Sequence, residues 1–365
     1  MNQFNKIPRV LAAVLALMIL LSSFQATVPA QADLDPVVVL YDASHSPQFD
    51  AANEESGLKL MFDMVNASTR YIIHVHENGD GELDETALNG VDILIIAGSD
   101  KSNPYSAAEY AGISEMLANG SSLFLLGDSA ISEDSTYWFD GPMQDLGDNI
   151  ALNTLLDGIN MTGPRFSINE TETNTWPDTL FDYDHALNET TPWVVQFDST
   201  TWDTTHPIFR NINEILTMTS TLKPVDLASG VGNSYDTSFA QYKRDSNSWA
   251  NYSTPNITLD EFALKPFSYS AINTTMPSWL SAFEYGLSRV TIVGSTIMFT
   301  GRNLDIPETE LQWFYVADNA RLFMNILDWL SADFVTAPSA IGSMLIISTV
   351  VLVFGVAFYL LKKLR

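Results

Sequence analysis

Short apolar runs alternate with helix-like segments between residues 37 and 129, and this alternation constrains the fold more than any other feature. Runs of this kind are typical of strands that are buried on both faces of a parallel sheet. The four runs, in chain order, are PVVVLYD, RYIIHVHE, VDILIIAGSD and SSLFLLGDS. Strands that alternate with helices form parallel βαβ units, and in such sheets the functional loops follow the carboxyl ends of the strands. The sequence therefore predicts an α/β fold.

The segments between these runs carry helical signals. In AANEESGLKLMFDMVN, apolar residues such as Leu58, Phe62 and Val65 recur at the spacing of one helix face. In YSAAEYAGISEMLANG, Ser106 and Glu109 stand in the register of a capping box. Both segments are therefore predicted to be helices.

The alternation is lost between about residues 160 and 288. This part is rich in Thr, Asn, Asp and Trp, with short β-like runs such as PWVVQF and ILTMTSTLKPVDL. We expect a β-rich insertion or lid within the α/β domain. Beyond it, SRVTIVGSTIMFT predicts a buried strand, and ETELQWFYVADNARLFMNILDWL predicts a long helix. The expected apolar stripe of that helix comprises Leu311, Phe314, Tyr315, Leu322, Ile326 and Trp329.

The N-terminus, residues 1–32, has the order of a secretory signal peptide. Lys6 and Arg9 give a basic start, residues 10–21 form a short apolar core, and AQA ends the segment as a cleavage site. Cleavage there would leave an exported domain that spans residues 33–333. An uncleaved N-terminal anchor is the alternative, although the apolar core is short for a membrane span.

A second apolar segment, residues 340–361, carries no charge and is long enough to cross a bilayer as a helix. Lys362, Lys363 and Arg365 follow at once, and positive charge of this kind stays on the cytoplasmic side. The tail, residues 362–365, is too short for a signalling domain. The sequence predicts a single-pass type I protein of the cell membrane, with the bulk of the chain extracytoplasmic.

The charge balance and the cysteine content exclude several classes of function. The chain has 44 Asp and Glu against 17 Lys and Arg, a formal net charge of −27, and every acidic residue lies between the two apolar segments. Such a surface repels nucleic acid and anionic headgroups. The chain has no cysteine, so neither a disulfide framework nor cysteine chemistry is available to it.

Asn-x-Ser/Thr triplets also lie between the two apolar segments, where glycosylation would need them. Each is a common chance match alone, but together they favour an outward-facing glycoprotein, as on eukaryotic or archaeal cell surfaces. The acceptor residues are Asn66, Asn119, Asn160, Asn169, Asn188, Asn251, Asn256 and Asn273.

Several motifs resemble one known domain family. LNGVDILIIAGSDKSNPYSAAEYAGISEMLANGSSLFLLGDSA is similar to the amidotransferase-like domain shared by intraflagellar-transport and gliding-motility transport proteins, called the GIFT domain. RVTIVGSTIMFTGRNLD with NARLFMNILDWL resembles the closing strand and helix of that family, and THPIFRNI its middle segment. The resemblance spans residues 37–330. We therefore expect a membrane-anchored, archaeal member of the GIFT type, related to class I glutamine amidotransferases.

This resemblance implies a flavodoxin-like sheet without amidotransferase chemistry. In active members of the wider superfamily a cysteine follows the strand that corresponds to residues 122–126, whereas here Gly127, Asp128 and Ser129 follow it. The resemblance then implies a binding or scaffolding module, with no cofactor. By analogy with the gliding-motility relatives, we expect it to assemble beside another membrane protein, such as a transporter subunit.

A serine-dependent hydrolase is the competing hypothesis. Ser129 ends the triplet GDS, and DTTH contains Asp203 and His206, so these three residues could act as nucleophile, acid and base; His45 is an alternative base. In GDS-type lipases, however, the GDS follows the first strand and Asp-x-x-His lies near the chain end. The elbow G-x-S-x-G fails as well, because Ile131 takes the last glycine position. A turn residue is the simpler interpretation of Ser129.

Polar residues that follow the first, third and fourth strands are expected to line one ligand cleft for a small molecule or a glycan. A metal site is not predicted, because His74 and His76 share one strand face without an evident third ligand. Trp176, Trp193, Trp202 and Trp249 would allow glycan stacking, although core packing explains them equally well. The expected cleft residues are Asp42, Ser44, His45, Ser99, Asp100, Asp128 and Ser129.

Overall fold

The computed structural model describes residues 36–46, 48–131, 135–139, 143, 146, 148–168, 176–223, 230–242 and 278–332. The chain divides into two compact units, Met1–Pro36 and Val37–Arg365, and the fold described below belongs to the second. Within the described ranges, no helix is long and apolar enough to cross a membrane. The predicted signal peptide, residues 340–361 and the tail lie outside these ranges, as do Asn169, Asn251, Asn256, Asn273 and Trp249.

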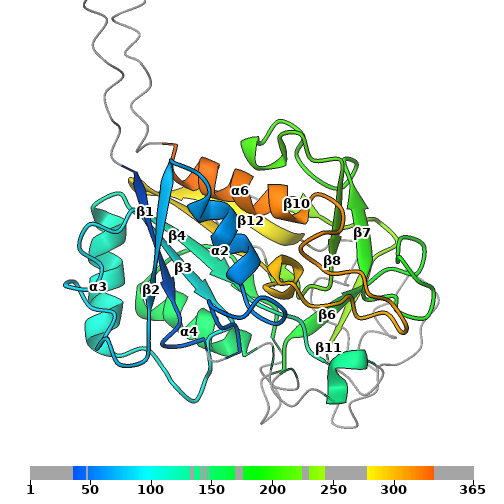
Figure 1. Ribbon diagram of the computed structural model, residues 1–365, viewed down its shortest axis with the longest axis horizontal. Helices are drawn as coiled ribbons and strands as arrows, with labels where there is room; N and C mark the ends of the chain where they lie inside the picture. Colours follow the sequence, from blue (N-terminus) through cyan, green and yellow to red (C-terminus); the bar gives the residue numbers. More distant parts are fainter. Residues whose placement is uncertain are drawn as a thin grey trace, which may run out of the picture. The chain divides into compact units, whose positions relative to one another are not determined.

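Five parallel strands form the centre of the fold (Figure 1). β1 (Val37–Asp42) lies between β2 (Tyr71–His76) and β3 (Ile93–Ala97), and β4 (Ser122–Leu126) and β13 (Ser288–Val293) follow β3 in that order. This is the 2-1-3-4-5 strand order of flavodoxin-like folds. β3 and β4 are buried along their whole length, as expected for strands covered on both faces. The predicted α/β fold is thereby confirmed.

The sheet is mixed rather than wholly parallel, which corrects the prediction of a parallel sheet. In the part of the chain that is described, nine strands share the sheet. Gly286 and Leu287 alone connect β12 (Ser278–Tyr285) to β13, and so short a link joins only antiparallel strands. Gly286 takes a φ of +63°, which a glycine adopts without strain. The other added strands are β9 (Leu222–Lys223), β5 (Arg165–Phe166) and β10 (Gly230–Asn233).

The segment predicted to be β-rich also supplies two antiparallel ribbons, each outside the main sheet. β6 (Asp178–Phe181) pairs with β11 (Phe239–Tyr242), and β7 (Val195–Asp198) pairs with β8 (Glu214–Thr217). Trp193 and Trp202 are buried here, and the ring of Trp202 stacks on Phe209 with centroids 4.9 Å apart. These two tryptophans therefore pack in the core and offer no exposed ring to a glycan.

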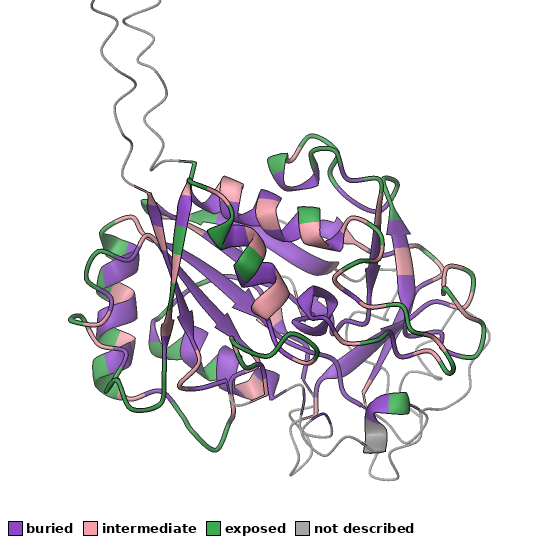
Figure 2. Ribbon diagram, in the orientation of Figure 1, coloured by how far each residue is buried: buried purple, intermediate pink, exposed green. Residues whose placement is uncertain are grey.

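Helices cover both faces of the parallel strands (Figure 1). α2 (Lys59–Asn66) and α6 (Asn319–Leu330) pack on one face, and α3 (Ala107–Ala118) and α4 (Asn149–Gly158) pack on the other. Figure 2 shows the inner strands almost entirely buried between these helices, whereas β2 is partly exposed. Successive side chains of a strand point to opposite faces. Accordingly, Ile93, Ile95 and Ala97 join the cluster of α2 and α6, whereas Leu94 and Ile96 join that of α3 and α4.

The predicted capping box of α3 is confirmed. The N–H of Glu109 donates to Ser106 Oγ, and the N–H of Ser106 donates to the Glu109 carboxylate. α4 (NIALNTLLDG) was not predicted; it follows Asp148, whose side chain makes no capping hydrogen bond.

The long C-terminal helix is shorter than predicted. It begins at Asn319, because Ala317 takes a positive φ of +49° that an α-helix does not allow. The preceding apolar residues do not form one stripe. Trp313 is buried and its Nε1 donates to the hydroxyl of Tyr137 at 2.8 Å, whereas Leu311 is 53% exposed and Tyr315 is 66% exposed.

Replacing Phe124 tests the assignment of the core between β4 and α6. Phe124 is fully buried, with its ring centroid 5.7 Å from that of Phe323 and 6.5 Å from that of Phe299. We expect Phe124→Ala to lower the free energy of unfolding by about 3–5 kcal/mol, because the cavity would not close. Leu311→Ala, on an exposed loop, should change it by less than about 0.5 kcal/mol. Chemical denaturation measures both, and equal losses would contradict this core.

Candidate functional site

The parallel strands end at one side of the sheet, which we call the carboxyl edge, and a pocket of about 740 Å³ opens there. It is enclosed by residues 48–56 after β1, by η1 (Thr136–Phe139) after β4, and by residues 301–312 after β13. A pocket at the carboxyl ends of parallel strands is the usual ligand position in open α/β sheets. Its volume also lies within the range of small-molecule sites.

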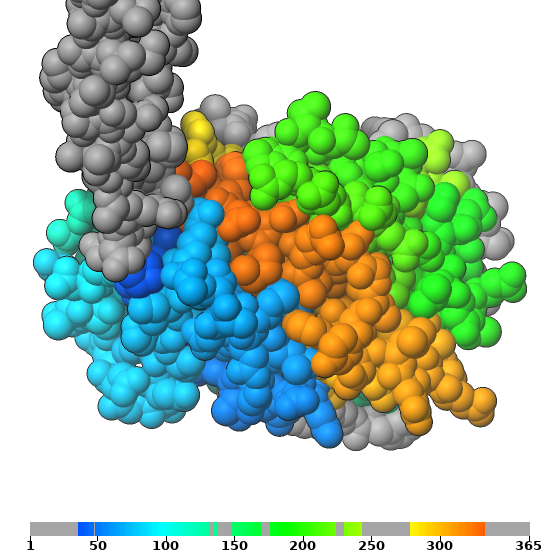
Figure 3. All heavy atoms as spheres, turned by 45° about the horizontal axis from the view of Figure 1, so that its top comes forward, coloured from blue at the N-terminus to red at the C-terminus, as the bar shows by residue number. Residues whose placement is uncertain are grey.

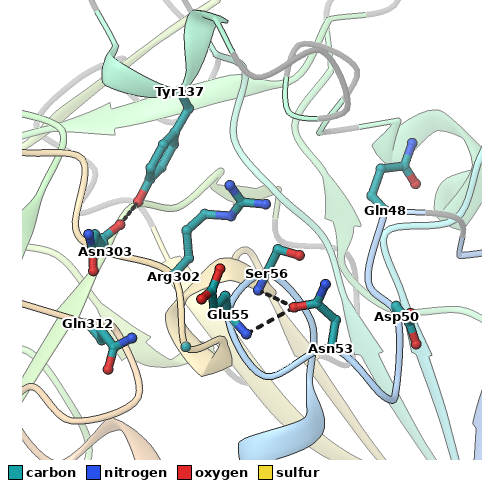
Figure 4. A pocket seen from close by; sticks show the side chains of 10 residues that line it. Gln48, Asp50, Asn53, Glu55, Ser56, Tyr137, Arg302, Asn303 and Gln312 are labelled. Carbon is teal, nitrogen blue, oxygen red and sulfur yellow. Dashed lines mark hydrogen bonds between the residues drawn. The ribbon is translucent and has the colours of Figure 1, made fainter.

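Polar side chains line most of this pocket (Figure 4). Amide and carboxylate groups provide both hydrogen-bond donors and acceptors, and an arginine adds further donors. The guanidinium of Arg302 lies over the ring of Tyr137, 5.8 Å from its centroid, and the Tyr137 hydroxyl donates to the carbonyl of Asn303. The lining residues are Gln48, Asp50, Asn53, Glu55, Ser56, Tyr137, Gly301, Arg302, Asn303 and Gln312.

Two of the enclosing loops meet by backbone contact. A Cβ atom at position 301 would lie 2.1 Å from the carbonyl oxygen of Glu54, so only a glycine fits there. Nearby, the side-chain oxygen of Asn53 accepts the N–H groups of Glu55 and Ser56, each at 2.9 Å. The loop after β1 is thus held against the loop after β13, and the pocket has a fixed junction between them.

A buried polar network lies at the end of β1, on the loop that also lines the pocket. The imidazole of His45 is bounded by two carboxylates: its Nδ1 lies 2.9 Å from Asp42 Oδ2, and its Nε2 lies 3.6 Å from Glu109 Oε2. Ser44 Oγ donates to Asp42 Oδ1 at 2.6 Å, and the Tyr105 hydroxyl donates to Asp42 Oδ2 at 2.9 Å. The network therefore joins the end of β1 to the first turn of α3.

The electrostatics of the network favour an ion pair. Burial opposes the charged forms of both Asp42 and His45, but their mutual hydrogen bond and attraction are stronger. The pKa of Asp42 is therefore lowered below its ordinary value, and the pKa of His45 is raised, with a further contribution from the charge of Glu109. The ring of Tyr105 stacks on the imidazole, with centroids 3.9 Å apart.

The third strand adds two more of the predicted cleft residues to this network. Ser99 Oγ lies 3.1 Å from the hydroxyl of Tyr105, and the backbone N–H of Asp100 donates to the carbonyl of His45 at 2.9 Å. The structure thus brings five of the predicted cleft residues together in one hydrogen-bonded and largely buried cluster: Asp42, Ser44, His45, Ser99 and Asp100.

Asp128 and Ser129 belong to a different set of contacts. Asp128 Oδ1 accepts the N–H groups of Thr296 at 3.0 Å and Ile297 at 3.2 Å, where η5 (Ile297–Phe299) begins. Within the described residues, Asp128 Oδ2 and Ser129 Oγ are buried and have no hydrogen-bond partner. Burial raises the pKa of Asp128 to about 7, although these hydrogen bonds oppose the shift. Asp128 is therefore largely protonated in mildly acidic solution.

Among the described residues, no hydrogen bond links the side chains of the hydrolase hypothesis, although the backbone N–H of His206 donates to the carbonyl of Asp203 at 3.1 Å. Ser129 Oγ has no partner among the described residues, and His206 Nδ1 accepts the N–H of Ile208 at 3.4 Å. The ring of His206 lies 5.2 Å from that of Trp329, on α6. Asp203 accepts from the backbone and hydroxyl of Thr205. No described contact therefore activates Ser129 as a nucleophile.

The remaining sequence predictions concern metals and sugars. Within the described residues, no group of His, Asp and Glu side chains has the arrangement of a metal site, and His76 Nε2 instead lies 3.2 Å from the carbonyl of Gly81. Asn66, Asn119 and Asn160 are exposed, and Asn188 is half-buried. Their accessibility is compatible with modification, which stays a prediction.

Sequence reasoning missed the pocket itself. Its lining residues stand in loops without any recognisable motif, and their proximity depends on β13 pairing with β4 from far along the chain. The polar content of the loops after β1 and β13 was the only available signal. The two loops could have been connected only if the strand order had been known.

Among known proteins, similarity to this chain was found only with solved structures. No family model matches the chain, and no curated protein matches it. The mmIFT52 N-terminal domain superposes with a TM-score of 0.42 at 15% identity, covering 80% of this chain and 100% of that domain. A cytoplasmic protein from Salmonella typhimurium gives 0.42 at 11% identity, covering 80% and 98%. A protein described as ThuA-like from Parabacteroides merdae gives 0.36 at 9%, covering 83% and 92%.

Removing the imidazole of His45 tests the buried network. His45→Ala leaves the carboxylates of Asp42 and Glu109 buried without their shared cation, so we expect a loss of about 3–5 kcal/mol in the free energy of unfolding. The difference from wild type should be greatest between about pH 4 and pH 6.5. It should decrease as the pH falls through the lowered pKa of Asp42 and as it rises through the raised pKa of His45.

A matched control is His185→Ala. His185 forms the same kind of pair with Asp182, three residues earlier, but it is 36% exposed, and Asp182 also accepts from Thr237 and Ser238. We expect a loss below about 1 kcal/mol. Denaturation curves from pH 3 to 10 measure both variants, and a pH-independent effect of His45→Ala would exclude the ion pair.

Asp128→Asn tests the raised pKa of Asp128. Because the folded-state pKa of about 7 lies above the ordinary value of 3.8, the wild type loses stability as the pH rises between these values. The variant keeps the oxygen that accepts from Thr296 but has no charge to bury. We expect it to gain on the wild type by roughly 1 kcal/mol per pH unit up to about pH 7, and to level off above. A parallel pH dependence of the two proteins would contradict the assignment.

Proposed function

We propose that this chain is a non-catalytic, membrane-anchored binding module that holds a polar ligand in the pocket at the carboxyl edge. The observation that carries the proposal is the pocket itself, which three separate loops enclose with amide, carboxylate and guanidinium groups. Its position after the carboxyl ends of β1, β4 and β13 is the one at which open α/β sheets bind ligands.

The chemistry of the lining favours a hydroxylated ligand, such as a glycan or a small polar metabolite. Side-chain amides both donate and accept hydrogen bonds, as sugar hydroxyls do, and Gln48, Asn53, Asn303 and Gln312 bring such amides to one pocket. Asp50 and Glu55 add acceptors, and Arg302 adds donors. An apolar ligand would leave most of these groups unpaired, which costs binding free energy.

A catalytic role has less support. The turn at which amidotransferases of similar fold carry their cysteine contains Gly127, Asp128 and Ser129 here, and Ser129 is fully buried. A nucleophile must reach its substrate and must contact a base, and Ser129 Oγ has no hydrogen-bond partner among the described residues. The hydrolase with Ser129, His206 and Asp203 therefore stays the second hypothesis.

The membrane anchor belongs to the same proposal. The signal-like residues 1–32 and the apolar residues 340–361 support export and anchoring by one C-terminal helix. An archaeal origin, glycosylation and assembly with a membrane transporter subunit remain part of it as predictions. Co-purification of the tagged chain from its native membranes would reveal an integral-membrane partner.

Binding to an oligosaccharide panel tests the proposed pocket. We expect the full chain in detergent to bind at least one member, and Asn303→Ala and Gln312→Ala each to weaken it by about tenfold, the value of one hydrogen bond. Asn89→Ala, an exposed amide outside the pocket, is the matched control and should bind as the wild type does. Isothermal titration measures the affinities.

A serine-directed fluorophosphonate probe distinguishes the second hypothesis. If Ser129 is a buried turn residue, the probe should not label the wild type. Labelling that Ser129→Ala removes, together with no sugar binding, would replace the binding module by a hydrolase.

A further inference from the structure

The first strand and the last helix of the domain are held together at the amino edge, the side of the sheet where the parallel strands begin. The N–H of Val37 donates to the carbonyl of Arg70 at 2.8 Å. The guanidinium of Arg70 donates to Ser331 Oγ at 2.7 Å and lies 3.4 Å from Asp328 Oδ1. α6 therefore ends beside the start of β1, as Figure 1 shows at the upper left of the sheet.

Three arginines gather around this end of α6. Arg210 is 67% exposed, and its guanidinium lies 3.7 Å from Asp328 Oδ2, so Asp328 is shared between Arg210 and Arg70. Arg289 donates to the carbonyl of Trp329 at 2.7 Å and lies over its ring. Arginine at a helix C-terminus is favoured by the helix dipole, and its planar guanidinium suits phosphate groups.

An exposed leucine lies next to the arginines. Leu287, in the turn between β12 and β13, is 75% exposed, the highest value among the large apolar residues described. Arg289 follows it by two residues and faces Glu284 across the hairpin. In Figure 3 this hairpin (yellow) and the end of α6 (orange) lie side by side. The amino edge thus combines cationic side chains with one apolar side chain that projects from a turn.

Two loops at the carboxyl edge are acidic. Residues 43–58 and 77–83, which follow β1 and β2, contain no lysine or arginine. Both loops are therefore strongly acidic, within a chain whose formal net charge is −27. Arg302 lines the pocket at the carboxyl edge, whereas Arg70, Arg210 and Arg289 gather where α6 ends. The acidic residues of the two loops are Asp50, Glu54, Glu55, Glu77, Asp80 and Glu82.

We propose that the amino edge docks on the anionic phospholipid headgroups of the membrane that anchors the chain, an inference that rests on the anchor in the proposed function. Residues 333–339 are all that separates Ala332 from the apolar segment 340–361, and a chain of that length reaches at most about 28 Å. At full reach the charges of the domain are largely screened by salt, whereas within a Debye length of about 8–10 Å an anionic bilayer attracts the arginines.

The docked orientation has a direct consequence for the pocket. Since the amino and carboxyl edges are opposite ends of the same parallel strands, the pocket faces away from the bilayer when the amino edge lies on it. Ligand then arrives from the solvent side, and Leu287 enters the interface between headgroups and acyl chains.

Depth-dependent fluorescence quenching tests the docking. The chain has no cysteine, so Leu287→Cys in the full-length protein carries a single fluorophore, and Ser102→Cys carries one on the carboxyl edge as the matched control. The proteins are reconstituted in vesicles of phosphatidylcholine with 0 or 30% phosphatidylglycerol, each with headgroup spin labels. We expect quenching at position 287 that rises at least twofold with phosphatidylglycerol and is lost in 0.5 M salt, and little quenching at position 102.

Charge variants then identify the contact. Arg210→Gln, in the Leu287→Cys background, should lower the docked population by about fivefold, the effect of one arginine near an anionic surface. Arg321→Gln, at the other end of α6 and 54% exposed, should leave it unchanged. Quenching that is equal at positions 287 and 102, or independent of anionic lipid, overturns the docking.

The membrane anchor is checked separately by extraction with alkaline carbonate. Retention of the chain in the membrane together with the expected quenching supports both proposals. Retention without quenching at position 287 overturns the docking alone. Release of the chain by carbonate overturns the anchor, and with it the docking.

Discussion

Helices cover both faces of the five parallel strands, so a ligand reaches these strands only at their two ends, and the rest of this structure depends on that constraint. α2 and α6 cover one face and α3 and α4 the other, so neither face is open to a ligand. The loops after β1, β4 and β13 therefore enclose the pocket at one edge, and the chain leaves the domain at the other.

Two buried carboxyl groups at the carboxyl edge differ in their charge state. Asp42 is paired with His45 and accepts from Ser44 and Tyr105, so its charge is retained inside the protein. Among the described residues, Asp128 has hydrogen bonds to one oxygen only, and burial raises its pKa. The ionised pair holds the loop after β1 to α3, which gives that loop one fixed end beside the pocket. Asp128, by contrast, accepts from the backbone where η5 begins in the core.

The central strands and the start of α3 could be predicted from the sequence, whereas the outer strands and the loops could not. Runs such as ILIIA predict buried strands because every residue is apolar, and Ser106 with Glu109 predicts the start of α3 because a cap is a local interaction. The loop before α6 was wrongly predicted to be part of the helix. Trp313 in this loop points toward Tyr137, which lies far away in the sequence, and a contact of this kind leaves no local signal. The cluster of Asp42, Ser44 and His45 was predictable from strand ends alone. The pocket was not, since it needs the pairing of β13 with β4 and the hairpin from β12.

The backbone contact between Gly301 and Glu54 separates what can vary in this pocket from what cannot. Any side chain at position 301 would push the two loops apart, so we expect a glycine to be retained at that position. The side chains of Gln48, Asn303 and Gln312 project from the same loops and carry no comparable restriction. Substitutions of these side chains can therefore change ligand selectivity without changing the arrangement of the loops. Proteins with this fold can accordingly differ in the ligand they bind.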